Sequence, residues 1–434
     1  MRQRYGSIES AVADWGFSPS LGPDGALPVP TSEMCTTRGA WDPLVAAFRR
    51  AWSDVFSQAY RDIVTRLRAY DSQHLISFRF GACSIPSGQA FAHSHSIGVL
   101  KHVDFMNPEG YSLSRGWCIP TPADDLRKGG LITLYFRHFS NEKPVVWMEF
   151  GYTVNGMVDP WTQDRVHVDP KEIAFQKVEY EGLFAMFLES GARGAAAWWM
   201  PGGFRLGENS DFGIVDPDGA ERPACKVMLE NLPKFDQVRH DPPTVFIDLD
   251  LDTHAADGWQ VYSEAYLRLV KAGQRPHVRT AGTGTDSADC PLTAVGGRPH
   301  TGHNPPIFLN SEFNSLEVRS GEGVWQAVHD GAVVRVKTDA PVMCRASVGN
   351  LAEATWRLPA DGQTGGVYLA GRRDYGLEFA APIEAETPFL GDAHVEEFVL
   401  IPQAHGETMI SFEMQARDRA WFGERRTVKI IAEP

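Results

Sequence analysis

The chain lacks several features that would place it in a narrow class. It has no run of about eighteen apolar residues, and its first nine residues contain no apolar segment of the kind that directs export. Its six cysteines show no Cys-x-x-Cys spacing, which argues against a zinc site or a disulfide framework. Positive charge is also scarce. With 41 basic and 55 acidic residues the net charge is −14, which argues against nucleic acid and anionic membranes as partners.

What remains is a globular composition, with 43% hydrophobic and 22% charged residues. A chain of 434 residues is long enough for about two or three domains with sizeable cores. The 12 Trp and 24 Phe either fill a large core or supply aromatic faces on which sugar rings can stack. The sequence as written predicts a cytoplasmic protein, or an extracellular one if an upstream segment is missing. We expect no cofactor and no metal.

Strand-like and helix-like segments alternate over the first two thirds of the chain. Apolar residues recur at three- and four-residue steps over 42–70 and 172–190, which predicts two amphipathic helices, the second ending at Gly191. Short apolar runs between polar segments predict strands at 74–81, 101–106, 143–149 and 194–200. We expect the second of these strands to be broken by Pro108. This alternation predicts an α/β fold built from βα units around a parallel sheet.

The segment Lys143 to Gly151 is a short apolar strand that ends in a carboxylate. Residues 145–148 have the composition of a strand that is buried on both faces. A glutamate at position 149 is costly there unless it has a function, and the strand ends of a (β/α)8 barrel carry catalytic groups. From the strand alone, a carboxylate that caps the next loop or pairs with an arginine is an equally good interpretation.

The residues Pro-Val-Val-Trp-Met-Glu-Phe-Gly at 144–151 resemble the strand-7 nucleophile motif of retaining glycoside hydrolases with a (β/α)8 barrel. This is the large clan that contains cellulases, mannanases and β-galactosidases. The stretch Arg4 to Gly16 resembles Tyr-x-Ser-Ile-x-x-x-Asn-x-x-Trp-Gly of family 42 β-galactosidases, with Val12 in place of the Asn. The chain is therefore similar to family 42-like and family 5-like enzymes from strand 5 of the barrel onward.

The resemblance implies the C-terminal half of a TIM barrel, strands 5 to 8, because about forty residues before the first helix leave no room for strands 1 to 4. In this clan the acid/base glutamate ends strand 4, so we expect it to lie upstream of this chain. The implied function is a retaining glycosidase of β-linked saccharides, or the C-terminal catalytic portion of one, with Glu149 as nucleophile. The alternative is a non-catalytic carbohydrate-binding or scaffold remnant. An oligo- or polysaccharide is the expected partner, and a homo-oligomer or a second chain would complete the barrel.

Further candidate site residues follow the other strands. Tyr111 matches the position after strand 6 where clan members often carry His-x-Tyr, and its hydroxyl would hold Glu149 ionised and oriented; a packed loop tyrosine is the alternative. The His is absent, and Asn107 and Glu109 stand nearby as candidate substrate-binding residues. Glu109 would be a substitute acid if the chain is complete, although a solvated loop glutamate is the more usual interpretation.

Two aromatic residues end strand 8, where the clan usually has a Trp under the sugar being cleaved. Of Trp198 and Trp199, we expect one to stack on the sugar and the other to pack against a helix. Arg79, at the end of strand 5, would bind a sugar hydroxyl or pair with Glu149.

Two patterns imitate metal sites. His93-Ser-His95 has no obvious third ligand, and the alternating aspartates at 248, 250 and 252 lack the Gly and Glu that close a calcium loop. We interpret both as solvated polar residues.

The character of the sequence changes after Pro233. We predict a partial barrel over 1–235, then a small α/β unit with a long loop over 241–306, and an antiparallel β-sandwich accessory domain over 307–434. Short strand-like runs separated by Gly, Asp and Pro support the last of these; they lie at 316–318, 333–336, 398–401, 410–414 and 427–431.

Overall fold

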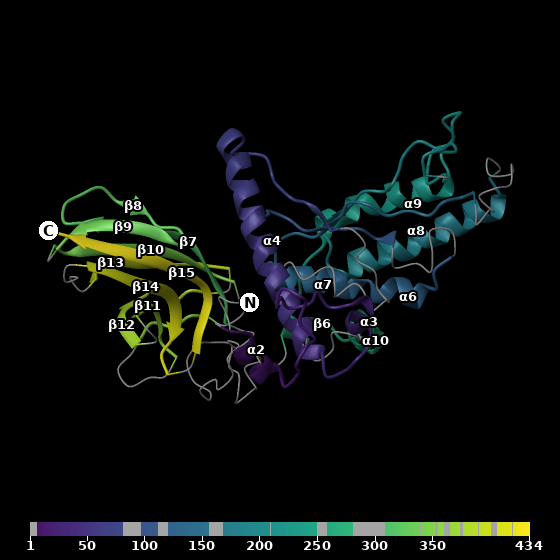
Figure 1. The fold of residues 1–434 in the computed structure, drawn as a ribbon. Helices are drawn as coiled ribbons and strands as arrows, with labels where there is room; N and C mark the ends of the chain where they lie inside the picture. Colours follow the sequence, from purple (N-terminus) through teal and green to yellow (C-terminus); the bar gives the residue numbers. More distant parts are fainter. Residues whose placement is uncertain are drawn as a thin grey trace. The chain divides into compact units, whose positions relative to one another are not determined.

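The structure is a computed structural model of the chain (Figure 1). It describes residues 7–80, 97–111, 120–155, 168–208, 210–249, 258–280, 309–338, 340–351, 355–359, 365–373, 376–388, 390–400, 406–418 and 420–434. The chain divides into two compact units, Met1–Pro19 with Thr280–Pro434 and Ser20–Arg279. The domain limits expected from the sequence stay a prediction. No helix in the described ranges is both long and apolar enough to cross a membrane.

The unit Ser20–Arg279 contains short parallel strands that neighbour one another in chain order. They are β1 (Arg79–Phe80), β2 (Asn107–Pro108), β3 (Val146–Trp147) and β4 (Gly194–Ala195). β1 pairs with β2 and β3 pairs with β4, while parallel bridges from Met106 to Val145 and from Glu109 to Glu149 join β2 to β3. Successive parallel neighbours are what βα units produce, so the predicted half-barrel is confirmed. The expectation that Pro108 breaks its strand is wrong, since it pairs with Phe80 at the end of β2.

Helices of this unit lie between and around the strands. They are α3 (Ser32–Thr36), α4 (Asp42–Tyr70), η1 (Ile97–Lys101), α6 (Ala123–Lys128), α7 (Gly130–Phe139), α8 (Pro170–Ser190), α9 (Pro223–Asn231) and η4 (Leu232–Gln237). Both predicted long helices are confirmed. α8 begins after Asp169, whose side chain accepts a hydrogen bond from the Lys171 amide, and it ends at Gly191 in the left-handed conformation.

The buried face of α8 differs from the predicted one. Phe175 and Val178 are exposed, while Gln176 and Glu179 are buried. The Gln176 amide nitrogen and the Glu179 carboxylate have hydrogen-bond partners on other segments, which makes their burial tolerable, whereas the Gln176 side-chain oxygen has none among the described residues. Gln176 Nε2 donates to the carbonyls of Tyr152 and Gly213, each at 3.0 Å. Glu179 accepts hydrogen bonds from the amide and the hydroxyl of Thr121.

Helix α4 contacts the half-barrel through polar and aromatic side chains rather than through its apolar stripe. Tyr60 packs on Phe78 with ring centroids 4.3 Å apart, and Arg68 pairs with Asp104. Within the stripe, Leu44 is buried and Phe48 is half-buried, whereas the members from residue 52 onward are exposed. They are Trp52 (44%), Phe56 (37%), Ile63 (49%) and Leu67 (47%).

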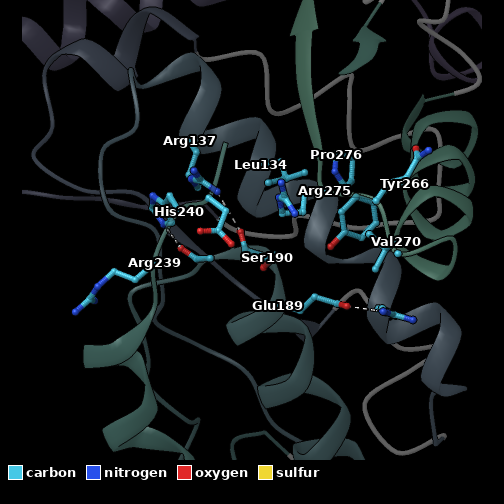
Figure 2. A pocket seen from close by; sticks show the side chains of 15 residues that line it. Leu134, Arg137, Glu189, Ser190, Arg239, His240, Tyr266, Val270, Arg275 and Pro276 are labelled. Atoms are coloured by element: carbon cyan, nitrogen blue, oxygen red, sulfur yellow. Dashed lines mark hydrogen bonds and ion pairs between the residues drawn. The ribbon is translucent and has the colours of Figure 1, made fainter. Parts of the chain in front are cut away.

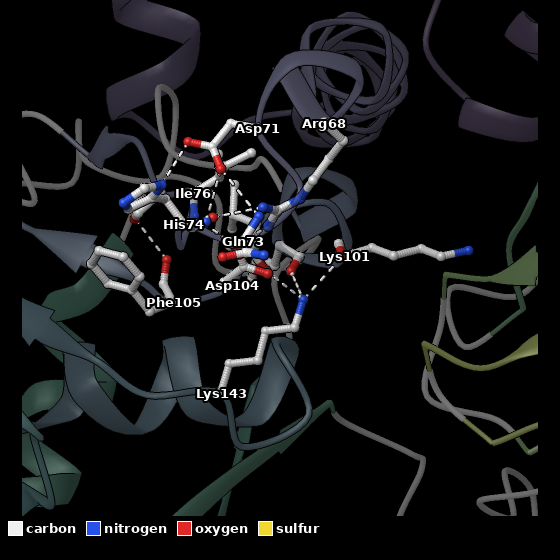
Figure 3. A network of polar contacts seen from close by, with 12 residues as sticks. Arg68, Asp71, Gln73, His74, Ile76, Lys101, Asp104, Phe105 and Lys143 are labelled. Atoms are coloured by element: carbon white, nitrogen blue, oxygen red, sulfur yellow. Dashed lines mark hydrogen bonds and ion pairs between the residues drawn. The ribbon is translucent and has the colours of Figure 1, made fainter. Parts of the chain in front are cut away.

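A polar network holds the amino ends of the first three strands (Figure 3). Asp104 accepts hydrogen bonds from Arg68 and, at 2.6 Å, from the Ile76 amide. The Lys143 ammonium donates hydrogen bonds of 2.7–2.9 Å to the carbonyls of Leu100 and Lys101, at the end of η1, and of Val103, just after it. Burial lowers the pKa of Lys143 to about 8, although the nearby charge of Asp104 acts in the opposite direction.

The small α/β element consists of β5 (Val245–Leu249), α10 (Gly258–Lys271) and β6 (Pro276–Thr280), with β5 and β6 in one sheet. Helix α10 packs on α6 and α7. Lys128 pairs with Glu264 at 2.5 Å, and a Cβ added at Gly130 would lie 2.1 Å from the Tyr266 hydroxyl. Residue 130 therefore has to be glycine for α10 to approach α7 this closely.

The other unit contains helix α2 (Ile8–Trp15) and two sheets. The sheet orders are β13-β10-β7-β8 and β12-β11-β14-β15-β9. The strands are β7 (Ser311–Ser320), β8 (Gln326–Ala327), β9 (Ala332–Lys337), β10 (Val342–Asn350), β11 (Val367–Arg373), β12 (Gly376–Pro382), β13 (Asp392–Leu400), β14 (Gly406–Ala416) and β15 (Ala420–Glu433).

The two sheets share one core, to which Phe313 and Val348 contribute from the first sheet and Phe412 and Val428 from the second. This is the predicted β-sandwich. Its strands are not all antiparallel as expected, because β9 pairs with β15 in parallel. The predicted long loop at 283–306 lies outside the described residues.

Candidate active site

Glu149 follows β3 at the carboxyl end of the half-barrel sheet. Its neighbours Trp147 and Phe150 are fully buried, and both rings lie 5.1 Å from the ring of Phe187 in α8. A Cβ at Gly151 would lie 2.3 Å from the carbonyl oxygen of Trp198, so residue 151 must be glycine for the ends of β3 and β4 to meet. These contacts fix the backbone on both sides of the carboxylate.

The expectation that residues 145–148 are buried on both faces is wrong at Met148, which is 41% exposed. Trp147 packs against α8 and donates its indole N–H to Thr133 of α7. These helices cover one face of β3. In a closed barrel the opposite strands would cover the other face.

Arg79 joins two carboxylates at the ends of neighbouring strands. Its Nε lies 2.6 Å from Oε1 of Glu109, and its Nη1 lies 2.5 Å from Oε2 of Glu149. The glutamate side chains are only 12% and 13% exposed, whereas Arg79 is 58% exposed. The hydrogen bond that Arg79 donates to Glu149, and then the charge of Glu109, raise the pKa of Arg79. Of the two alternatives for Arg79, pairing with Glu149 is the one the structure shows.

Tyr111 follows β2 and lies beside Glu149. Burial is the first cause that raises the pKa of its hydroxyl, and the nearby charge of Glu149 is the second. A hydroxyl that stays protonated can donate to the carboxylate. The Gly110 amide also donates to the Glu149 carbonyl at 2.7 Å, which ties the turn that carries Tyr111 to the end of β3.

The other two candidates on this segment lie differently. Glu109 is not a solvated loop residue, because it is bridged to Glu149 and paired with Arg79. Asn107 is part of β2. Its side-chain oxygen is buried and has no hydrogen-bond partner among the described residues. A direct contact of Asn107 with a sugar stays a prediction.

Trp198 and Trp199 follow β4 and are joined by a cis peptide bond. Their rings stack with centroids 5.7 Å apart. The guanidinium of Arg205 lies over both rings, at 4.0 Å from the Trp199 centroid and 5.1 Å from the Trp198 centroid. The expectation that one ring stacks on a sugar and the other packs against a helix stays a prediction. Arg205 is held at 2.8 Å by Glu208, which also accepts a long hydrogen bond from the Trp198 indole.

Sequence reasoning missed Arg205 and Glu208. The only signal for them was a pair of opposite charges three residues apart, shortly after the two tryptophans. Such a pair is ordinary on a protein surface, and only the turn after β4 brings it onto the indole rings.

A buried ion pair holds the segment that follows the tryptophans. Arg222 binds Asp211 through two parallel hydrogen bonds of 3.1 and 2.8 Å, and both side chains are almost fully buried. Arg222 also donates to the Gly213 carbonyl at 2.7 Å. This pair fixes the turn next to the aromatic residues without contacting them.

A pocket of about 400 Å³ lies at the other end of the half-barrel (Figure 2). Ser190 and Gly191 line it and directly precede β4, so it opens at the amino ends of the strands. Its wall contains the ion pair of Arg127 with Glu189, at 2.7 Å. It also contains Arg137, whose partner Glu142, at 2.8 Å, is not a lining residue. The pocket is therefore separate from the site around Glu149.

No group of His, Cys, Asp and Glu within the described ranges is arranged to hold a metal ion. His93 and His95, and the aspartates at 250 and 252, lie outside those ranges.

Comparison with known proteins gives distant similarities only. No family model and no curated protein matches the chain. Among solved structures, a β-galactosidase from the haloarchaeon Halorubrum lacusprofundi is 14% identical, with 91% of this chain and 74% of that chain covered and a TM-score of 0.47. A cold-adapted β-galactosidase from Rahnella sp. R3 is 12% identical, with 99% and 73% covered and a TM-score of 0.48. An exo-β-1,4-mannosidase from Opitutaceae bacterium strain TAV5 is 11% identical, with 96% and 77% covered and a TM-score of 0.33. Similarities at this level do not assign a function to the chain.

Proposed function

We propose that this chain is a glycoside hydrolase, or the C-terminal catalytic portion of one, that hydrolyses β-linked saccharides with retention of configuration. The observation that carries the proposal is the position of Glu149. It is a nearly buried carboxylate at the carboxyl end of a half-barrel strand, contacted by Arg79 and lying beside the protonated hydroxyl of Tyr111.

Each neighbour would have a defined task in such a reaction. Glu149 would attack the anomeric carbon and form a glycosyl ester. Tyr111 would orient the attacking carboxylate by donating a hydrogen bond to it. The rings of Trp198 and Trp199 would offer an aromatic surface at the end of β4 against which a sugar can stack.

One observation favours the alternative, a non-catalytic carbohydrate-binding protein. Arg79 contacts both carboxylates and thereby occupies the space between them. A protein of this kind would bind a saccharide next to the tryptophans and release it unchanged.

Hydrolysis of 2,4-dinitrophenyl β-galactosides and β-mannosides, whose leaving group departs without a proton, separates the two functions. For the full chain we expect turnover, with the β-anomer of the sugar as the first product seen by NMR. Glu149→Gln should lower the rate by several orders of magnitude and leave the melting temperature nearly unchanged. A wild-type chain that binds these glycosides but never cleaves them would contradict the proposal and support the binding protein.

A further inference from the structure

We propose that the pocket at the amino ends of the half-barrel strands binds a small organic anion, that is, one oxyanion group carried on an apolar body. The pocket has about 400 Å³ of space and is lined by residues of α7 and α8 and of helix α10 in the α/β element (Figure 2). The inference does not depend on the proposed function, because the pocket lies at the other end of the strands from Glu149.

The charge of the pocket wall is the first support. In a chain with a net charge of −14, four arginines and two acidic residues are among the described residues that line this pocket. Two of the arginines already have carboxylate partners, Glu189 and Glu142. The other two, Arg239 and Arg275, stand against one further acid, Asp241. The wall therefore keeps an excess of positive charge, which an anion can neutralise.

Arg275 is the side chain placed to hold the anion. Its backbone amide donates to the Thr244 hydroxyl at 2.9 Å, and its Nε donates to the Pro242 carbonyl at 3.0 Å, so its position is fixed. It forms no ion pair with a carboxylate in the part of the chain that the structure describes, and its two Nη atoms remain as donors for a ligand. Figure 2 shows Arg275 among the lining side chains and Arg239 directed away from them. A guanidinium with two available nitrogens matches the geometry of a carboxylate or a phosphate.

Tyr266 brings a buried hydroxyl to the same pocket. The residue is only 2% exposed, and within the described ranges its hydroxyl forms no hydrogen bond. Buried tyrosine hydroxyls usually have a partner. Burial raises the pKa of Tyr266, so the hydroxyl keeps its proton and can donate. Figure 2 shows it pointing inward, towards the other lining residues, where an oxygen of the ligand would be its acceptor.

The apolar part of the wall requires more than an inorganic ion. Leu134 and Val270 are buried and line the pocket together with the Tyr266 ring. An organic anion would cover this surface and remove its own apolar body from water. Glu189 and Asp241 line the pocket as well and would repel a ligand of high charge. These features favour a single carboxylate or phosphate monoester on a small apolar group.

Contacts between distant segments hold the pocket in shape. Nε2 of His240 lies 3.0 Å from the Gly191 carbonyl oxygen, which ties the segment before β5 to the end of α8. Tyr266 fits against Gly130, where no side chain would leave room for it. A pocket that is already formed costs little ordering when a ligand enters. Because the ligand would contact the half-barrel and the α/β element together, binding should also raise the melting temperature.

The test is calorimetric titration and thermal unfolding of the full chain at about 0.15 M salt, which screens exposed charges. The probes are phenyl phosphate, benzoate, inorganic phosphate and phenol. We expect at least one of the two aromatic anions to bind at a single site and to raise the melting temperature. Phenyl phosphate should bind about tenfold or more tightly than inorganic phosphate, and phenol should not bind at the same concentrations. The tighter of the two aromatic anions identifies the oxyanion that the pocket prefers.

Variants locate the binding in this pocket. Arg275→Gln should weaken binding of the preferred anion by about tenfold, and Tyr266→Phe by about threefold. Arg268→Gln removes the same charge from an exposed position of α10 outside the pocket and should bind as the wild type does. Melting temperatures without probe show whether each variant folds. Tyr266→Phe keeps the buried ring and provides an independent test if Arg275→Gln is destabilised.

Failure of both aromatic anions to bind would overturn the proposal, as would binding that Arg275→Gln and Tyr266→Phe leave unchanged. Equal affinity for phenyl phosphate and inorganic phosphate would show an adventitious ion only and would overturn it as well. None of these outcomes depends on the hydrolysis of glycosides, so each is distinguishable from a failure of the proposed function.

Discussion

Glu109 and Glu149 are bridged neighbours at the carboxyl ends of two parallel strands, and a single guanidinium contacts both of them. Two carboxylates at this spacing would repel in the absence of a cation. Arg79 offsets that repulsion, and its exposure leaves it accessible to a ligand.

The tryptophan pair should separate into one binding and one structural residue. The Trp199 indole nitrogen is buried and its ring lies close under Arg205, so Trp199→Ala should mainly lower the melting temperature. Trp198→Ala should mainly weaken saccharide binding, by about fivefold, which corresponds to about 1 kcal/mol of stacking. Calorimetric titration and thermal unfolding of both variants measure this. Equal losses of stability with unchanged binding would show that both are structural residues.

Glu142 should stabilise the fold in a pH-dependent way. Burial would raise the pKa of this carboxyl, but the hydrogen bond with His277 and the charge of Arg137 outweigh it and lower the pKa from 4.5 to about 2. Because the pKa is lowered in the folded state, the ionised Glu142 stabilises the fold fully above about pH 4.5, and this stabilisation disappears as the pH falls towards 2. In urea unfolding, Glu142→Gln should therefore have a lower free energy of unfolding than the wild type at pH 7. This difference should disappear near pH 2. A difference in unfolding free energy that stays constant with pH would refute the role of the ionised Glu142.

Lys143 should also make the fold more stable as the pH rises, but in a higher pH window than Glu142. Burial lowers its pKa from 10.5 to about 8, so between these values the unfolded chain binds more protons than the folded chain. Stability from this group then rises with pH across that window. We expect the free energy of unfolding of the wild type to increase relative to Lys143→Met between pH 7.5 and about pH 10. A difference that shrinks with pH over this range would show that the ammonium is not penalised by burial.

The exposed stripe of α4 should make the chain self-associate. Ile63 and Leu67 are each about half exposed and lie on the same helix as the stacked pair Trp52 and Phe56. Contiguous exposed apolar residues favour association. Sedimentation velocity should show concentration-dependent oligomers that the double variant Ile63→Glu, Leu67→Glu reduces. Gln58→Glu, which adds a charge at an exposed position of the same helix, should not. A wild-type chain that stays monomeric at high concentration would contradict the prediction.

Sequence patterns identified the elements whose signals are local. The helix over 42–70 begins next to a proline and continues without interruption, and α8 ends at the glycine that its backbone requires. The order of the half-barrel strands followed from their alternation with helices. Four sandwich strands, β8, β10, β11 and β12, were not anticipated. Part of the reason is visible in β11, whose first five residues are buried without alternation. Its Gly371 is needed because Phe379 packs directly above it.

Relationships between distant residues were harder to foresee. Arg79 and Glu149 are seventy residues apart in the sequence, and their contact depends on the register of three strands. The motif around Glu149 singled out the carboxylate, but nothing local indicated that Glu109 would be its bridged partner. The buried face of α8 was misjudged for a related reason, since Gln176 can be buried only because two carbonyls from other segments accept its hydrogen bonds.

The most direct test of the central claim is covalent trapping of Glu149. Incubating the full chain with 2,4-dinitrophenyl 2-deoxy-2-fluoro-β-glycosides of galactose and mannose should add one fluorosugar per chain, because the activated leaving group needs no acid and the fluorine slows release of the ester. Intact mass and peptide mapping should place the label on Glu149, and Glu149→Gln should remain unlabelled. A label on another residue, or turnover of the ordinary glycosides without trapping at Glu149, would contradict its role as nucleophile.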